Sequence, residues 1–185
     1  MRLIEGDFLK YQKALVRAIC AGKIFIYPTD TIYGLGCDAT NRKSVEKIRK
    51  LKHRERQPFL VAVPNLEWIW QNCEVTDLEK HQIEQKLPGR YAFFLKIKNK
   101  KALVYKEINP SDDGTIGIRF FNHAFQNIIT KAGVPFVSTS VNISNEPFSE
   151  TIEHMPGSIK RASDYVIYQG PISGPPSTKI DLTKT

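Results

Sequence analysis

Cysteine, histidine and long apolar runs are scarce in this sequence of 185 residues. Its three cysteines, Cys20, Cys37 and Cys73, are odd in number and form no CxxC pair, which indicates neither a disulfide framework nor a cysteine zinc site. We predict reduced structural thiols. No stretch approaches the roughly 20 apolar residues of a membrane-spanning helix, and the start of the chain turns acidic where a signal peptide stays apolar. We therefore expect a cytoplasmic protein with no membrane partner.

The common nucleotide and metal motifs are missing as well. The sequence contains no GxxxxGK[ST], no GxGxxG and no HExxH, and its four histidines are scattered. If the protein binds a nucleotide, the phosphates must be held by side-chain cations and hydroxyls, because no phosphate-binding glycine loop is present. No protein metal site is predicted.

The composition is that of an ordinary globular protein. Hydrophobic residues make up 41% and charged residues 25% of the chain, which excludes a disordered tail, a collagen-like chain and a disulfide-dense mini-protein. We expect one domain over residues 1–185, because a chain of this length buries enough surface to fold without disulfides or a structural metal.

Basic residues outnumber acidic ones by 27 to 19, a net charge of +8, and most of this excess falls in one segment. Residues 42–56 contain eight lysines and arginines and two glutamates, which leaves a charge of +6. Such a basic patch attracts the phosphates of a nucleotide or of RNA. A solvated helix face is the alternative that charge alone leaves open.

Hydrophobic spacing predicts that strands alternate with helices. Apolar residues recur at helical spacing from Phe8 to Ile19, and Ile24 to Tyr27 is a short β-rich run. Thr40 or Asn41 caps a second predicted helix. Further strands are predicted over residues 59–63, 91–97, 116–120 and 134–137 and beyond Ser177, and further helices over 66–87 and around Phe125, Ile128 and Ile129. This alternation indicates an α/β sheet.

Three polar groups of residues are candidates for a binding site. Pro58 predicts an extended run over residues 52–57, in which Lys52, Arg54 and Arg56 point the same way and suit phosphate oxygens. A second group follows a predicted buried strand, where open α/β sheets collect ligands, although a turn with a helix N-cap is the simpler explanation. Its members are Ser138, Ser140, Asn142 and Ser144.

The third group runs from Thr29 to Gly36, just past another strand, and by itself it is a generic turn. Thr115 and Arg119 flank a further strand. An arginine in that place grips a substrate carboxylate in bidentate fashion, or pairs with an acidic neighbour.

Taken in order, these strings resemble the YrdC/TsaC family of threonylcarbamoyl-AMP synthases. The matching stretches span nearly the whole chain, and the ordered set is far more specific than any one of them. They are YPTDTIYGLGCDA at residues 27–39, KxR at 52–54, LPG at 87–89, TIGIR at 115–119, VPFVSTSVNIS at 134–144 and STKID at 177–181.

The resemblance implies a twisted, open mixed sheet with flanking helices around a concave basic pocket. It also implies a nucleotidyltransferase that joins L-threonine, bicarbonate and ATP into threonylcarbamoyl-AMP and pyrophosphate, with Mg²⁺ bound mainly through the ATP phosphates. The product feeds the downstream machinery that makes threonylcarbamoyladenosine in tRNA. By this resemblance ATP is held by Lys52, Arg54, Thr115, Ser140 and Asn142, with Lys52 and Arg54 as the catalytic pair on the phosphates, and threonine is held by Thr31, Arg119 and Ser177.

Four positions depart from the family pattern. Glu55 replaces a proline and puts a negative charge near the proposed phosphate site, and Arg90 follows Pro-Gly where a second proline is common. Ala92 stands where threonine is usual, and Asn145 stands where glycine follows the SxNxS run.

Two other functions compete with the synthase. The basic segment could bind tRNA or double-stranded RNA without any synthase activity, and salt dependence distinguishes the two because RNA binding falls steeply with salt. A carbamoyl-adenylate-forming relative is the second alternative, since related domains occur in hydrogenase maturation proteins, although within much larger chains.

Overall fold

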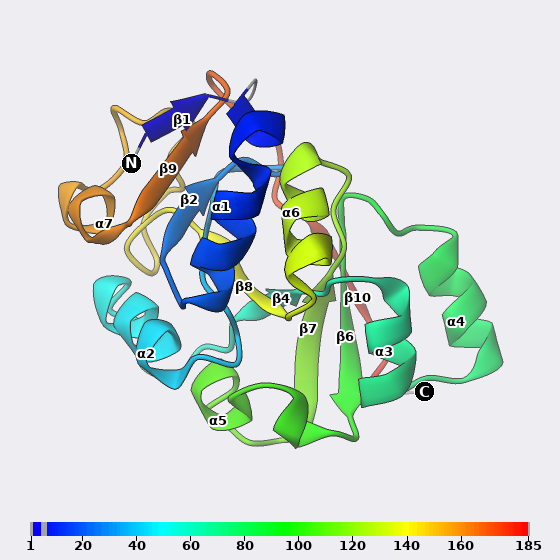
Figure 1. Ribbon diagram of the computed structural model, residues 1–185. Helices are drawn as coiled ribbons and strands as arrows, with labels where there is room; N and C mark the ends of the chain where they lie inside the picture. The colour runs from blue at the N-terminus through cyan, green and yellow to red at the C-terminus, as the bar shows by residue number, and fades with distance from the viewer. Residues whose placement is uncertain (1, 5–6, 185) are drawn as a thin grey trace.

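The computed structural model describes residues 2–4 and 7–184, and within them the strands form one twisted, open sheet with helices packed around it (Figure 1). The spatial order is β1-β9-β2-β3-β8-β4-β7-β6-β10, and β5 pairs with β6 outside this path. The sheet contains parallel pairs (β1–β9, β2–β9, β4–β7, β6–β10) and antiparallel pairs (β2–β3, β3–β8, β4–β8, β6–β7). The predicted open mixed sheet with flanking helices is therefore confirmed.

The strands are β1 (Arg2–Ile4), β2 (Phe25–Tyr27), β3 (Gly34–Gly36), β4 (Leu60–Ala62), β5 (Cys73–Glu74), β6 (Tyr91–Ile97), β7 (Thr115–Arg119), β8 (Phe136–Ser140), β9 (Tyr165–Tyr168) and β10 (Thr178–Asp181). The helices are α1 (Phe8–Cys20), α2 (Arg42–Leu51), α3 (Leu66–Asn72), α4 (Asp77–Glu84), the short 3₁₀ helix η2 (Lys100–Ala102), α5 (Tyr105–Ile108), α6 (Ala124–Ala132) and α7 (Gly157–Ala162).

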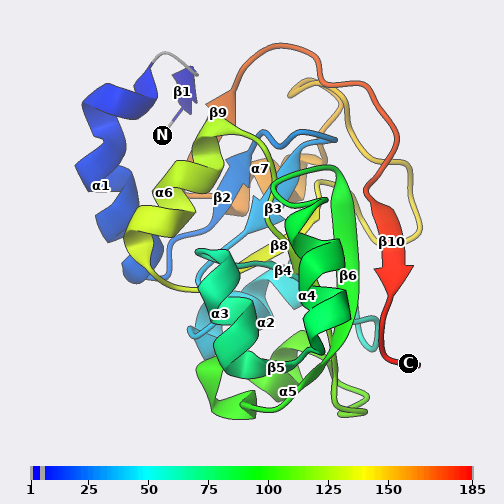
Figure 2. The same cartoon turned by 90° about the vertical axis from the view of Figure 1, so that its right-hand side faces the viewer.

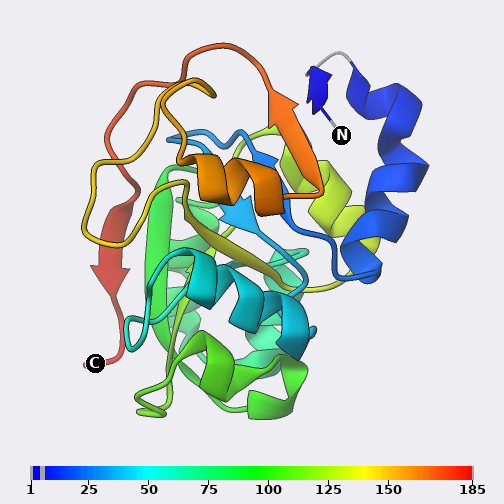
Figure 3. The same cartoon turned by 90° about the vertical axis from the view of Figure 1, so that its left-hand side faces the viewer.

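One part of the core lies under α1 and α6, which pack side by side across β2 (Figure 1). Phe25 and Tyr27 of β2 meet Phe125 of α6 and Phe136 of β8, with ring centroids 4.5–6.0 Å apart. A larger cluster includes Ile48 of α2 and Val61 of β4. The views from the two sides show α3 and α4 beside β6 (Figure 2) and α2 and α7 on the other side (Figure 3).

The helix ends follow from their capping residues. Asn41 rather than Thr40 caps α2, because its side chain accepts a hydrogen bond from the backbone N–H of Ser44. α6 ends at Gly133, whose φ of 70° is left-handed. The predicted helical stretch 66–87 is divided, since Cys73 is extended and pairs with Ile97 of β6. The predicted strand 134–137 starts later, at Phe136, and continues to Ser140.

The predicted extended run over residues 52–57 is wrong. Lys52 keeps helical backbone angles after α2, and His53 has a left-handed φ of 49°, so the segment turns. The three basic side chains therefore do not point together: Lys52 is buried, Arg54 is half-buried and Arg56 is exposed.

The hairpin of β2 and β3 was not predicted, because Gly34-Leu35-Gly36 lacks the β-branched and aromatic residues typical of strands. The structure explains the glycines. A Cβ on Gly36 would lie 2.0 Å from the carbonyl oxygen of Val137, and one on Gly34 would lie 2.6 Å from the Tyr27 ring. β3 thus fits between β2 and β8 only without side chains at these positions.

All three cysteines are free thiols, as predicted, with Cys37 and Cys73 buried. No helix among residues 2–4 and 7–184 is long and apolar enough to cross a bilayer. The acidic start of the chain, at Glu5, lies outside the described residues.

Candidate active site

A pocket of about 430 Å³ gathers side chains from segments that are far apart in the sequence. Two strands contribute to its lining: Ala92 and Phe94 come from β6, and Ser138, Thr139 and Ser140 come from β8. The other walls come from the turn before β3, from residues 54–60, from the end of β7 and from residues 176–179. Cationic and small polar side chains therefore do meet in one cavity.

Arg119 ends β7 and is held from the turn between β2 and β3. Its Nη2 donates to Oδ1 of Asp30 at 2.6 Å, and its Nη1 donates to the hydroxyl of Thr31 at 3.2 Å. The side chain is buried and lines the pocket, and its Nε–H has no partner among the described residues. The guanidinium is oriented by Asp30 and retains N–H donors for a ligand.

Arg54 lines the pocket from a segment without helix or strand, just before β4. Its Nε donates to the carbonyl of Gln57 at 3.1 Å and its Nη2 to that of Pro58 at 2.7 Å, so the side chain curls over its own loop. The guanidinium also lies over the ring of Phe59, 5.3 Å from the centroid. Burial lowers the pKa of Arg54.

Lys52 lies behind the pocket wall, with its side chain 0% exposed. Nζ donates to the carbonyls of Ser140 (2.6 Å) and Asn142 (2.7 Å) and to Oδ1 of Asn142 (2.8 Å). These bonds engage all three donors of the ammonium group. Burial, and next the charge of Arg54, lower the pKa of Lys52 to about 7. Lys52 therefore fixes the loop after β8.

In that loop the side chains of Ser140 and Asn142 are hydrogen-bonded to each other. The Ser140 hydroxyl, at the edge of the pocket, lies 2.5 Å from Oδ1 of Asn142, and the amide of Asn142 donates to the carbonyl of Glu146. The backbone N–H of Ser144 donates to the carbonyl of Lys52 at 2.9 Å. The KxR and SxN strings are thus brought into direct contact.

The remaining two predicted residues lie apart from each other. Ser177 lies at the pocket, just before β10. Thr115 starts β7, at the opposite end of the strand from Arg119, and its hydroxyl donates to Asp113 at 2.6 Å. Of the eight predicted site residues, the pocket lining includes five (Thr31, Arg54, Arg119, Ser140 and Ser177), while Lys52 and Asn142 lie directly behind it. Their individual roles stay predictions.

The departures from the family pattern have structural explanations. Glu55 is exposed and outside the pocket lining, and Asn145 adopts a φ of 71°, which asparagine tolerates better than most residues. Ala92 faces the pocket, where threonine would add a hydroxyl. Arg90 packs against the loop before β10, since its Nη2 would lie 2.7 Å from a Cβ on Gly174.

Sequence reasoning missed the role of two residues. Asp30 belonged to the polar string at Thr29–Gly36, but its pairing with Arg119 was not predicted. The signal in the sequence was that Asp30 is adjacent to Thr31, which was assigned to the same site as Arg119. Arg49 counted only as one charge of the basic segment, although it holds the loop that bears Arg54. No spacing rule identifies a side chain that bonds to the carbonyls of a loop without regular structure.

Comparisons with known proteins agree with this fold. The family model Sua5_yciO_yrdC, described as Telomere recombination, matches residues 17–185. A protein of Methanocaldococcus jannaschii to which threonylcarbamoyl-AMP synthase activity is ascribed is 33% identical over 183 residues, which cover 97% of this chain and 84% of that protein.

Two solved structures share the fold. P. abyssi Sua5 complexed with L-threonine superposes with a TM-score of 0.81 at 23% identity, over 98% of this chain and 54% of that one. E. coli YciO superposes with a TM-score of 0.83 at 24% identity, over 100% of this chain and 90% of that one. This chain thus spans about half the length of Sua5. With the family model matched over most of its length, the chain belongs to the Sua5/YciO/YrdC family.

Proposed function

We propose that this protein is a threonylcarbamoyl-AMP synthase, a nucleotidyltransferase that uses L-threonine, bicarbonate and ATP. The observation that carries the proposal is the single pocket whose lining includes Arg119 and Arg54 together with the hydroxyl-bearing residues Thr31, Ser140 and Ser177. Two anionic substrates that must react with each other need this arrangement of cations.

In this proposal threonine binds at the Arg119 end. The free N–H donors of the guanidinium take the substrate carboxylate, and Asp30 and Thr31 keep the group in place. Ser177 approaches from the segment before β10 and offers a hydroxyl to the amino acid. The threonine amine is then directed towards the middle of the pocket.

ATP binds at the opposite end. Arg54 faces the phosphates, and the apolar side chains of Phe59 and Phe94 supply a surface for the base or ribose. Ser140 contributes a hydroxyl from β8. Lys52, Asn142 and Thr115 complete the set assigned to ATP by resemblance, the first two by holding Ser140 from behind.

The chemistry requires no covalent enzyme intermediate. Bicarbonate takes up a proton and loses water to give CO₂, and the threonine nitrogen attacks its carbon and loses a proton, which gives the carbamate. A carbamate oxygen then attacks the α-phosphorus of ATP, the bond to the β-phosphate oxygen breaks, and pyrophosphate leaves. The chain contributes orientation and positive charge along the phosphates, which suffice for phosphoryl chemistry of this kind.

Magnesium, in this proposal, belongs to the nucleotide. Among the described residues no group of three or more His, Cys, Asp or Glu side chains could hold a metal ion, and the pocket lining offers hydroxyls and arginines. Mg²⁺ prefers to keep water and phosphate oxygens as ligands, which fits such a site. When bound, it neutralises charge on the leaving pyrophosphate.

The test is the dependence of pyrophosphate release on threonine. Purified protein with ATP, Mg²⁺ and bicarbonate should release pyrophosphate only when L-threonine is added, and mass spectrometry should detect threonylcarbamoyl-AMP. Carbamoyl phosphate in place of threonine and bicarbonate is the control, and it should give no product. If folded protein releases pyrophosphate at the same rate with and without L-threonine, the proposal is contradicted.

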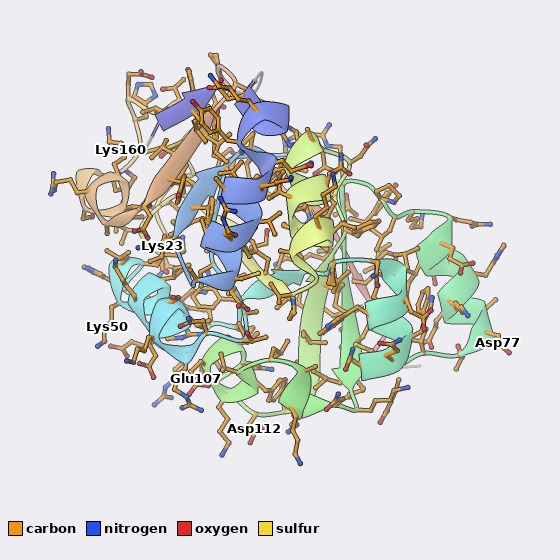
Figure 4. The ribbon with its side chains drawn as sticks, in the orientation of Figure 1. Lys23, Lys50, Asp77, Glu107, Asp112 and Lys160 are labelled. Atoms are coloured by element: carbon orange, nitrogen blue, oxygen red, sulfur yellow. The ribbon has the colours of Figure 1, made fainter. Side chains whose placement is uncertain are left out.

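RNA binding is a second candidate, favoured by the charge of α2. Lys43, Lys47 and Lys50 are exposed on this helix, and Lys50 is labelled at the edge of the molecule in Figure 4. The charge-reversed triple variant K43E/K47E/K50E should then lose affinity for double-stranded RNA and keep threonine-dependent turnover. Unaltered RNA affinity at low salt contradicts this second function.

A further inference from the structure

Arg49 occupies an unusual place at the end of α2, behind the wall that contains Arg54. Its Nη1 donates to the carbonyl of Arg54 at 2.7 Å and to that of Gln57 at 3.1 Å. Its Nη2 donates to the carbonyl of Glu107 at 2.6 Å. One side chain thus joins two points of the loop to α5, which approaches α2 at Glu107 (Figure 4).

The loop needs such a partner because residues 54–59 belong to no helix or strand. Backbone carbonyls without a regular ladder must find donors elsewhere. Arg49 supplies them from a planar group with fixed geometry, and the guanidinium also lies over the Phe59 ring, 4.4 Å from its centroid. The same residue therefore holds both the backbone and an aromatic side chain of the loop.

What Arg49 holds is one wall of the pocket. Arg54, Gln57, Pro58 and Phe59 all line the cavity, and Arg49 contacts three of them from the side away from it. The Arg54 side chain in turn lies over the carbonyls of Gln57 and Pro58, so its direction follows the path of this loop. A shift of the loop moves the Arg54 guanidinium relative to Ser140.

The charge of Arg49 is maintained at neutral pH. Burial, and next the neighbouring charge of Arg54, lower its pKa to about 10, and Glu107 acts in the opposite direction. Arg42 pairs with the Glu107 carboxylate from the exposed side. The Arg49 guanidinium therefore stays protonated at neutral pH and keeps all of its N–H donors.

We infer that Arg49 is a positioning residue for the nucleotide end of the pocket, acting through Arg54 rather than by touching ATP. This inference rests on the proposed function. It assigns a role to a residue of the basic segment outside the KxR string.

The experiment compares R49M, R49K and the matched control R17M, which removes one exposed arginine from α1. The KM for ATP and the Kd for ATP–Mg²⁺ are measured next to the Kd for L-threonine alone. We expect R49M to weaken ATP binding about tenfold and to leave threonine binding within about twofold, because Arg119 lies on another wall. R49K keeps the charge without the fork and should not restore ATP binding. R17M should match the wild type.

A double-mutant cycle with R54A separates positioning from general destabilisation. If Arg49 acts through Arg54, adding R49M to R54A should reduce ATP affinity by less than about twofold more. Wild-type protein that makes product, together with an R49M protein that binds ATP equally well, overturns the inference alone. Equal losses of ATP and threonine binding in R49M, or full recovery in R49K, also overturn it. Wild-type protein that binds no ATP overturns the proposed function, and this inference with it.

Discussion

At the scale of single residues, the fold buries two long cationic side chains, Lys52 and Arg119, and matches each with acceptors. Lys52 has three acceptors for its three N–H donors. Arg119 pairs with the carboxylate of Asp30, and its Nε–H has no partner among the described residues. In the first arrangement every N–H donor of the ammonium group has an acceptor within the protein. The second suits a cation that receives a ligand.

The titration of Lys52 should appear in the stability of the protein. Its pKa is about 7 in the folded chain, below the ordinary 10.5, so between these values the unfolded chain holds more protons and stability rises with pH. We expect Lys52 to add about 2 kcal/mol to the free energy of unfolding between about pH 6.5 and 9. Urea unfolding of K52M, which cannot titrate, should show a rise smaller by that amount.

NMR of the Lys52 Cε resonance in the wild-type protein gives the pKa directly and needs no variant. A titration midpoint above about pH 9 would show that its three hydrogen bonds outweigh burial, and the predicted pH dependence would be wrong.

Replacing Arg119 with lysine should affect threonine more than ATP. Lysine keeps the charge but offers one point of attachment in place of a planar fork. We expect R119K to raise the KM for threonine about tenfold to a hundredfold, or roughly 1.4–2.8 kcal/mol, with a smaller effect on the KM for ATP. R161K, at an exposed position of α7, is the control. An unchanged threonine KM in R119K would remove the assignment.

At the scale of elements, hydrophobic spacing predicted the long ones. α1, α2, α6 and β6 were identified because each carries an apolar pattern over two turns or several strand residues. β1, β3, β9, α5 and α7 were not predicted. β3 lacks the β-branched and aromatic residues that identified other strands as short, such as β2 and β4. β1 and β9 pair with each other across most of the sequence, which no local pattern indicates.

β3 provides a test of why its glycines are required. A Cβ on Gly36 would meet the carbonyl oxygen of Val137 at 2.0 Å, and a backbone group of a paired strand cannot move aside. We expect G36A to lower the free energy of unfolding by about 1–3 kcal/mol or more. G157A is the control, because its Cβ would meet only the end of the Arg161 side chain, at 3.1 Å. Equal denaturant midpoints for G36A and the wild type would contradict this account.

At the scale of the whole molecule, the pocket exists only because six stretches of the chain converge. The sequence strings predicted that Arg54, Ser140, Arg119 and Ser177 belong to one site, and the structure brings these four to one cavity. The turn at His53 places Lys52 behind the wall. It could not be predicted, because no sequence pattern marks a residue other than glycine that adopts a left-handed backbone conformation. Contacts to backbone carbonyls, such as those of Arg49, leave no pattern either.

A pocket with walls from six stretches of the chain should couple ligand binding to global stability. A ligand that binds only the folded chain at about a hundred times its Kd adds roughly 2.7 kcal/mol to the free energy of unfolding. We expect L-threonine to raise the Tm of the wild type in a calorimetric scan and to raise that of R119K much less. D-threonine is the control, and an equal rise with it would contradict a specific site.

The order of strands has a consequence for synthesis of the chain. β9, at residues 165–168, lies between β1 and β2, which both come far earlier in the sequence and are therefore synthesised before it. Until β9 arrives, β2 has an unpaired edge, and unpaired edges are sites of mispairing between chains. Because such distant partners also slow folding, the nascent protein depends on protection of that edge until β9 has been synthesised.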